Sequence, residues 1–537
     1  MADLKNNKEK RRWWIEACFT TVSPLHVGGD GFFKQLSTKE ELTEINGVVT
    51  DCDGRAYIPG STIKGNMRAW LQKNIAVGDD IEKNLFGEDS VENDSGRGGK
   101  AEFWDARIIT PFEPHFHIPH WNPRRQTGIE LSAVINRSDG TAAQSLLHTL
   151  EYVPSGVTFR LIITGNGFTP EEIACLLTIL ESCKDAAKNN AGTPQPLRFG
   201  SGSSNNYGQM ECNISCVRAT SKESVDKWLA ADCPGSWTDC LEPLDDTLAK
   251  EIETARNGLT ILGEDRIRIM LKLSFSGPFL INDPTREVMG KDVDGKARKL
   301  DHVPLLDGQG KICLPPKSFR GALRSQAEKI LRTMGCRCCR PDIAEERCPA
   351  IYRNEDADTL LCPVCQIFGA GGWGAPLVIE DISLNNIPAT VVRQFVAIDR
   401  FTGGTAGGAK FDAKVAMEPE FIITLSLDYG RLANRSIALL AMLWRDLYEG
   451  DIRFGMDKGI GFGVCRATVE SIENPSETSG LEPTGHNIQK VYKNIRTIIM
   501  EDQKRGVVSK VLREIVESSM ERLNIPPDAA AVMEEKV

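Results

Sequence analysis

The chain has 537 residues, of which 41% are hydrophobic, and this is more than one core usually serves, so we expect two globular domains. Its formal net charge of −10 argues against a protein that coats bulk nucleic acid through a general positive field, although a local basic groove is compatible with it. No stretch approaches the roughly 20 apolar residues of a membrane span. Residues 1–12 are too polar for a signal peptide, so we expect a cytoplasmic protein without a membrane segment.

The first predicted elements are a strand, a hairpin turn and a helix. Residues 12–28 alternate as a half-buried strand does, and Val48-Val-Thr-Asp51 with Asp53-Gly54 predicts a hairpin. Pro59-Gly-Ser-Thr-Ile-Lys-Gly65 then predicts a proline stop, a Ser or Thr at the helix N-cap and an amphipathic helix. Such a helix start offers free backbone N–H groups, with Lys64 and Arg68 one turn apart. The pattern suits a phosphate.

The second half of the chain repeats these landmarks in the same order, which indicates a duplicated module. The offset between copies rises from 256 at the proline turn (59 to 315) to 282 at a Phe-Gly landmark (85 to 367), so the second copy carries about 26 extra residues there. The matched pairs are residues 12–28 and 266–281, 48–51 and 304–307, 59–68 and 315–324, 85–87 and 367–369, 103–105 and 378–381, and 198–200 and 453–455.

Six cysteines lie close together in the extra segment of the second copy: Cys336, Cys338, Cys339, Cys348, Cys362 and Cys365. A Cys-x-x-Cys pair with two further thiolates suits a tetrahedral, structural Zn²⁺ site. The predicted ligands are Cys339, Cys348, Cys362 and Cys365, with Cys336 or Cys338 able to replace Cys339. Reduced cysteines packed in a helical insertion are the alternative, and a redox Cys-x-x-Cys lacks the surrounding strand and helix of such sites.

Composition sets the predicted domain boundaries. The first domain spans residues 12–215, and a polar, acidic linker with a short helix at 247–257 follows at 216–264. The second domain spans 265–472, with the cysteine-rich insertion at about 335–366. Residues 473–537 form a linker and a tail whose residues 488–524 have helical spacing.

Several of these motifs, taken in order, resemble a known family. They are Pro-Leu-His-Val-Gly-Gly at 24–29, Ile-Pro-Gly-Ser-x-Ile-Lys-Gly-x-x-Arg at 58–68, Leu-Phe-Gly at 85–87, the Arg137 region leading to 151–156, and the C-terminal glycine loops. Together they resemble the RAMP backbone subunits of type III CRISPR effector complexes, over about 12–215 and 264–470. A tandem of two such subunits resembles the multi-domain variants of the III-D or III-E branches.

The resemblance implies an α+β fold of two ferredoxin-like (RNA-recognition-like) domains with β-hairpin thumbs, whereas the periodicities alone indicate only α+β. It implies a ribonucleoprotein subunit that binds CRISPR RNA and complementary single-stranded target RNA. Its other expected partners are further RAMP-type subunits and the large polymerase/cyclase-like subunit.

In the resembling subunits a single loop Asp cuts target RNA with Mg²⁺ or another divalent ion. That position falls on Asp301, six residues before Asp307, and in the first copy on Ile45, with Glu44 and Asn46 beside it. We therefore predict that the second domain cuts while the first binds and spaces. Without the resemblance Asp301 is an ordinary loop carboxylate. Asp292 and Asp294 are rivals, Glu44 is a substitute in the first copy, and His302 could assist proton transfer.

The glycine loops 198–208 and 453–463 let the backbone approach a phosphate or base, although such turns are often only tight bends. A solvated helix face is the alternative for the helix cations, and a core or turn position for His26. Two other functions stay open: a non-catalytic structural subunit, and a guide-processing endonuclease that uses His26 or His302. The predicted RNA-binding residues are His26, Lys64, Arg68, Arg198, Arg320, Arg324 and Lys458.

Overall fold

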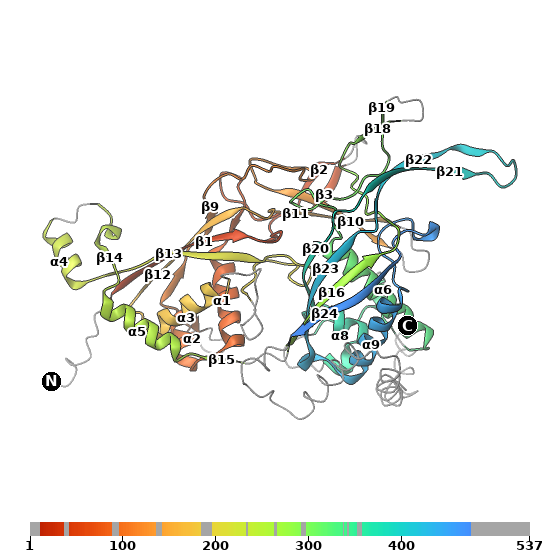
Figure 1. The fold of residues 1–537 in the computed structure, drawn as a ribbon. Helices are drawn as coiled ribbons and strands as arrows, with labels where there is room; N and C mark the ends of the chain where they lie inside the picture. Colours follow the sequence, from red (N-terminus) through yellow and green to blue (C-terminus); the bar gives the residue numbers. More distant parts are fainter. Residues whose placement is uncertain are drawn as a thin grey trace. The chain divides into compact units, whose positions relative to one another are not determined.

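A computed structural model describes residues 11–36, 42–88, 96–135, 142–183, 196–231, 235–262, 266–291, 297–336, 338–340, 343–351 and 357–473. The chain divides into two compact units, Met1–Ser203 with Tyr207–Glu264 (unit 1) and Ser204–Asn206 with Asp265–Val537 (unit 2) (Figure 1). The predictions for Arg137, Asp292, Asp294 and the C-terminal tail lie outside the described residues. Within the described part, no helix is long and apolar enough to cross a bilayer.

Unit 1 is built on an antiparallel sheet in the order β14-β13-β1-β12-β9-β4, with β8 also paired to β12. Strand β1 alternates as predicted: Trp13, Ile15, Ala17 and Phe19 are buried, and the residues between them are half-buried. The strands are β1 (Arg12–Thr21), β4 (Tyr57–Ile58), β8 (Ala101–Phe103), β9 (Ala106–Ile108), β12 (Thr158–Asn166), β13 (Met210–Thr220) and β14 (Leu241–Pro243).

Helices α1 (Gly60–Asn74) and α3 (Pro170–Glu181) cover one face of this sheet (Figure 1). A capping box starts α3, since the Thr169 side chain accepts from Glu172 N while the Glu172 carboxylate accepts from Thr169 N. The other elements are α2 (Asp79–Phe86), the hairpins β2 (Phe32–Gln35) with β3 (Leu42–Ile45) and β10 (Gly128–Ile135) with β11 (Ala142–Tyr152), and the short pairs β5 (Ile75–Ala76) with β15 (Thr260–Ile261) and β6 (Gly87–Glu88) with β7 (Arg97–Gly98).

The segment 216–264, predicted as a linker, is part of unit 1. It contributes the end of β13, α4 (Lys222–Ala230), the 3₁₀ turn η2 (Trp237–Cys240), the edge strand β14 and α5 (Asp246–Asn257). Helix α5 packs on α3 and buries Ile252, as the predicted short helix required. The segment is polar because its helices bury only one apolar face each. Composition alone therefore does not distinguish it from a linker.

Unit 2 has a four-stranded antiparallel sheet in the order β20-β23-β16-β24, covered on one face by helices α6, α8 and α9 (Figure 1). The hairpin β21–β22 extends beyond the rest of the unit. The bounds are β16 (Arg266–Phe275), β17 (Pro278–Phe279), β18 (Met289–Lys291), β19 (Ala297–Lys299), α6 (Pro316–Thr333), η3 (Ala344–Glu346), α7 (Ala357–Leu360), α8 (Pro363–Phe368), β20 (Leu377–Leu384), β21 (Thr390–Ile398), β22 (Thr405–Met417), β23 (Glu420–Asp428), η4 (Tyr429–Arg431), α9 (Asn434–Glu449), η5 (Lys458–Ile460) and β24 (Cys465–Glu473).

The two units repeat one another in backbone detail. The register of the pair β1–β13 shifts between Glu16 and Ala17 in unit 1, and that of the pair β16–β24 shifts between Met270 and Leu271 in unit 2. The predicted hairpin turns also match, because the side chains of Asp51 and Asp307 each accept two backbone N–H groups of their own turn. The sequence repeat is therefore a repeat of structure.

Candidate functional site

Asp301 lies immediately beyond β19, beside strand β22 of the long hairpin. Its backbone N–H donates to Asp412 O at 3.1 Å, and its Oδ2 accepts the backbone N–H of Asp412 at 2.8 Å. The side chain remains 43% exposed, and Asp301 Oδ1 has no partner among the described residues. One carboxylate oxygen is therefore held in place while the other is available to a ligand or a proton.

The same backbone arrangement occurs in unit 1 without the acid. His302 forms a parallel bridge with Ala413, and Asn46 forms the equivalent bridge with Leu150. His302 N donates to Asp412 O as Asn46 N donates to Thr149 O. This places Ile45, which is fully buried, where unit 2 has Asp301, in agreement with the sequence alignment.

Two charged neighbours of Asp301 were missed by the sequence reasoning. Arg298 of β19 places NH2 at 3.9 Å from Asp301 Oδ2 and NH1 at 3.3 Å from Asp412 Oδ2. The Asp412 side chain is 3% exposed, and its Oδ1 is buried without a hydrogen-bond partner among the described residues. The sequence around Asp412 does not indicate this position, and only the fold brings Asp412 next to Asp301.

His302 is less suited to proton transfer than its position beside Asp301 suggested. Its ring packs edge-on against Phe411 at 5.4 Å, and its Nδ1 is buried without a partner among the described residues. Phe411 in turn stacks on Phe395 at 4.9 Å. The imidazole therefore packs against the middle of the β21–β22 hairpin.

A cavity of about 670 Å³ lies close to this centre within unit 2. Arg286, Lys311 and Lys414 line it, and no described residue of its lining is acidic. Lys414 N donates to His302 O at 2.9 Å, so the cavity reaches the strand that carries Asp412. Its charge suits an anionic ligand.

The glycine loops adopt the same conformation in both units, with Gly200 and Gly455 at positive φ. A Cβ at Gly200 would lie 2.2 Å from His26 O, so this loop needs glycine. Arg198 NH1 donates to Ser203 O at 3.0 Å, and Arg453 NH1 donates to Lys458 O at 2.8 Å. Arg198, a predicted RNA-binding residue, therefore stabilises its own loop by a hydrogen bond.

The side chain of His26, one of the predicted RNA-binding residues, is buried in the structure. The residue is 5% exposed, and its Nδ1 lies 2.7 Å from Glu151 O. Glu151 is itself buried, where it accepts from Arg125, Thr127 and Val48 N. His26 therefore has a core position, which was one of the alternatives that the sequence left open.

The helix starts differ from the prediction in their capping. Pro59 and Pro315 are the N-cap residues, and neither helix has a side-chain cap. In unit 1 the N–H of Gly60 instead donates to the Asp105 carboxylate at 2.9 Å, so an acid already occupies the predicted phosphate position. The glycine is required because a Cβ there would lie 2.1 Å from Phe103 O.

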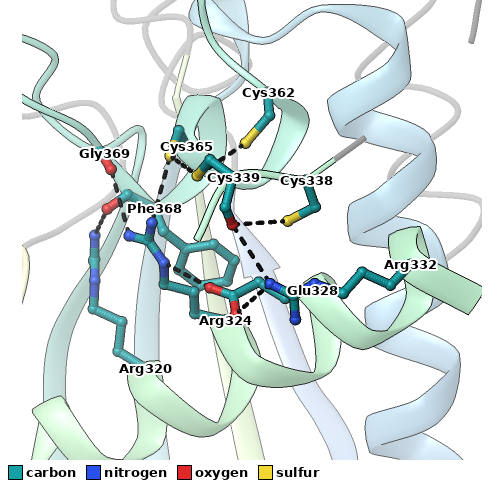
Figure 2. A network of polar contacts seen from close by, with 10 residues as sticks. All are labelled: Arg320, Arg324, Glu328, Arg332, Cys338, Cys339, Cys362, Cys365, Phe368 and Gly369. Carbon is teal, nitrogen blue, oxygen red and sulfur yellow. Dashed lines mark hydrogen bonds and ion pairs between the residues drawn. The ribbon is translucent and has the colours of Figure 1, made fainter. Parts of the chain in front are cut away.

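The repeated arginines of these helices join two helices. Arg68 of α1 forms an ion pair with Glu82 of α2, and Arg324 of α6 donates to Cys365 Sγ at 3.4 Å and to Gly369 O at 3.5 Å in and after α8 (Figure 2). Each arginine thus links a long helix to the next short one, α1 to α2 in unit 1 and α6 to α8 in unit 2. Both guanidinium groups therefore have partners within the protein, and their predicted contact with RNA stays a prediction.

Arg320 is also turned inward. Its guanidinium donates to Phe368 O (Figure 2). It also donates to Leu377 O at 3.0 Å. Burial, and then the positive charge of Arg324, lower the pKa of Arg320 to about 10, so it stays charged at neutral pH. Among the predicted cations, Lys64 and Lys458 have side chains without a partner in the described part of the chain; Lys64 is half-buried and Lys458 is exposed.

We expect Arg320→Gln to lower the free energy of unfolding by about 1–3 kcal/mol, because two buried carbonyls lose a charged donor. Lys329→Gln, at an exposed position of the same helix, is the matched control and should change it by less than about 0.5 kcal/mol. Thermal melting of the two variants measures the difference. Weaker RNA binding by the Arg320 variant at unchanged stability would instead support a phosphate contact.

The cysteine-rich insertion brings four thiols together. The sulfur atoms of Cys339, Cys348, Cys362 and Cys365 all lie within 4.8 Å of one another. Cys339 Sγ is 3.3 Å from Cys365 Sγ and 3.6 Å from Cys362 Sγ, close to the spacing of about 3.8 Å that four sulfurs at 2.3 Å from Zn²⁺ would have. The cluster can therefore bind zinc, and it contains the four residues that the sequence favoured.

The surroundings of this cluster suit a structural ion. Four buried residues, Ile351, Ala357, Leu361 and Cys365, form a small core of their own beside it. Arg324 places its guanidinium on Cys365 Sγ, and Arg332 donates to Cys339 O at 3.5 Å (Figure 2). Cations around four thiolates compensate their negative charge.

Comparison with known proteins agrees with the internal repeat. The model of the RAMP superfamily matches residues 18–211 and again residues 193–466. A relative from Methanocaldococcus jannaschii, the CRISPR system Cms endoribonuclease Csm3, is 22% identical over 204 residues, which cover 34% of this chain and 73% of the relative. The chain belongs to the RAMP superfamily and consists of two such domains in tandem.

Proposed function

We propose that the chain is a backbone subunit of a type III CRISPR ribonucleoprotein, which binds CRISPR RNA and its complementary target RNA and cuts the target from unit 2. The family and the relative named as an endoribonuclease support a role in RNA binding and cleavage. Asp301 carries the proposal, because it is an anchored, half-exposed carboxylate at the position where unit 1 has Ile45. Other RAMP-type subunits and a large polymerase/cyclase-like subunit are the proposed partners.

Each core has the connections of a ferredoxin-like βαββαβ domain in this proposal. In such a domain the first strand lies between the fourth and the third. Unit 1 has this order as β13-β1-β12, and unit 2 has it as β24-β16-β23. The hairpins β10–β11 and β21–β22 occupy the place of thumbs. In the second hairpin, Val391, Ile398 and Phe401 are exposed and suit contact with bases.

The RNA path in unit 2 would follow the basic cavity beside Asp301. Arg286, Lys311 and Lys414 offer positive charge to phosphates there, and Lys458 adds a cation on the glycine loop. A local surface of this kind is compatible with an acidic chain, because phosphate contacts act at short range in salt.

The cutting step would use the target's own 2′-hydroxyl as nucleophile. Its oxygen would attack the adjacent phosphorus and form a 2′,3′-cyclic phosphate, the P–O5′ bond would break, and the leaving 5′-oxygen would take a proton from water. Asp301 Oδ1 would accept the proton of this hydroxyl, or hold the water that does, while Oδ2 stays fixed on Asp412 N. A divalent ion held at Asp301 would neutralise charge on the scissile phosphate. The structural Zn²⁺ that we propose at Cys339, Cys348, Cys362 and Cys365 would hold the insertion and take no part in this chemistry.

The test is cleavage by the assembled complex. The chain is purified with its guide RNA and partner subunits, and incubated with a labelled complementary RNA or a scrambled RNA of the same composition. We expect cuts in the complementary RNA and none in the scrambled RNA. Digestion of the guide should abolish both binding and cutting. A complex that binds the complement and leaves it intact would support a non-catalytic structural subunit.

A further inference from the structure

We infer that Asp412 is a positioning residue of the cutting centre, which acts by holding the guanidinium of Arg298 away from Asp301. The inference rests on the proposed cleavage by Asp301. Arg298 lies between the two carboxylates, 3.3 Å from Asp412 Oδ2 and 3.9 Å from Asp301 Oδ2. The shorter contact goes to the buried acid, so Asp301 has the longer and weaker contact with the guanidinium.

Burial explains why Asp412 controls the arginine. Its side chain is 3% exposed, while those of Asp301 and Arg298 are 43% and 36% exposed. An ion pair with a desolvated carboxylate is screened less by water than one with an exposed carboxylate. Asp412 Oδ1 is buried without a partner among the described residues, which is a costly arrangement for an acid that only supports the fold.

The internal repeat supplies an independent comparison. The backbone contact between His302 and Asp412 has its counterpart in unit 1, where Asn46 N donates to Thr149 O. At the three positions where unit 2 has Arg298, Asp301 and Asp412, unit 1 has the uncharged residues Leu42, Ile45 and Thr149. The three charges therefore occur together in one unit and are all missing at the equivalent positions of the other.

The consequence is electrostatic. If Asp412 were neutral, the guanidinium of Arg298 would turn to Asp301 and would occupy its carboxylate. The carboxylate of Asp301 would then be less available to a hydroxyl group or a cation. Removing Arg298 as well would free Asp301 again. A residue that only supported the fold would not be rescued in this way.

The experiment uses the complete guide-bound complex and single-turnover cutting of complementary RNA. We expect Asp412→Asn to slow the cut by about tenfold or more, since proton acceptance by a positioned base contributes at least that much. Target binding should be unchanged. Adding Arg298→Gln to this variant should recover a large part of the rate. Asp412→Thr, which introduces the residue that unit 1 tolerates at this position, should behave in the same way if the Asn variant folds poorly.

Asp446→Asn is the matched control, because Asp446 is also a buried acid of unit 2 paired with an arginine, at 2.9 Å from Arg445. It should melt at a lower temperature and cut at the normal rate. Normal cutting by both Asp412 variants, or equal slowness of the single and double variants, would overturn the inference. Loss of cutting in Asp301→Ala shows separately whether the proposed function holds.

Discussion

The complex that contains Asp301→Ala should assemble on guide RNA, bind complementary RNA and fail to cut it. The substitution removes the one carboxylate of the centre that is both anchored through Asp412 N and open to solvent. We expect the rate to fall by about 10²–10⁴-fold, the range for loss of a positioned acid or base. Because the side chain is half-exposed, stability should change little. Mapping of the 5′ ends of the products measures which cuts disappear.

Glu44→Ala is the control for this experiment. Glu44 is an exposed acid on β3, next to the position in unit 1 that matches Asp301. It should leave every cut in place. If Asp301→Ala cuts normally and Glu44→Ala does not, the assignment of roles to the two units is reversed. Formation of mature guide ends without this chain would exclude the guide-processing alternative.

Cys362→Ser should cost the chain a bound zinc ion and much of the stability of unit 2. The four sulfur atoms lie within 4.8 Å of one another, and only a small apolar core surrounds them. Structural zinc contributes about 10–16 kcal/mol in isolated zinc fingers, so a large loss in melting temperature is expected here. Metal analysis should give one zinc per chain for the natural protein, and less for the variant.

Cys338→Ser is the matched control for the metal site. Cys338 is a neighbour of Cys339 whose thiol donates to a backbone carbonyl, and it lies outside the group of four. Its replacement should retain the zinc and the melting temperature. Chelator should lower the melting temperature of the natural chain and of this control, and should not change that of Cys362→Ser. A metal-free natural chain with the stability of Cys362→Ser would mean that the thiols are only packed side chains.

The sequence predicted what depends on local pattern or on repetition. The alternation of β1, the turns at Asp51 and Asp307 and the group of four cysteines were all found in this way. It failed where a side chain's partner is set by the fold. Arg68 and Arg324 follow similar helix starts, which suggested a shared ligand, whereas the shared feature is the short helix that packs beside each of them.

Asp412 is a second residue whose partner could not be predicted from the sequence. Its amide bonds to a carboxylate 111 residues earlier in the chain, and nothing in the sequence around it indicates that partner. Only the pairing of β21 with β22, and the bridge from β22 to His302, places the two acids together. Local motifs could identify Asp301, but not the group that orients it.

The hydrogen-bonded glycine loops 198–208 and 453–463 have a consequence for the affinity of the proposed RNA binding. In both units an arginine closes the loop on a carbonyl five residues later, and glycines at positive φ fix its turns. The loop is thus ordered before a ligand binds. The conformational entropy of its backbone is lost when the protein folds, and not when RNA binds. Association then loses little conformational freedom at these loops, so contacts there should contribute to affinity almost in full.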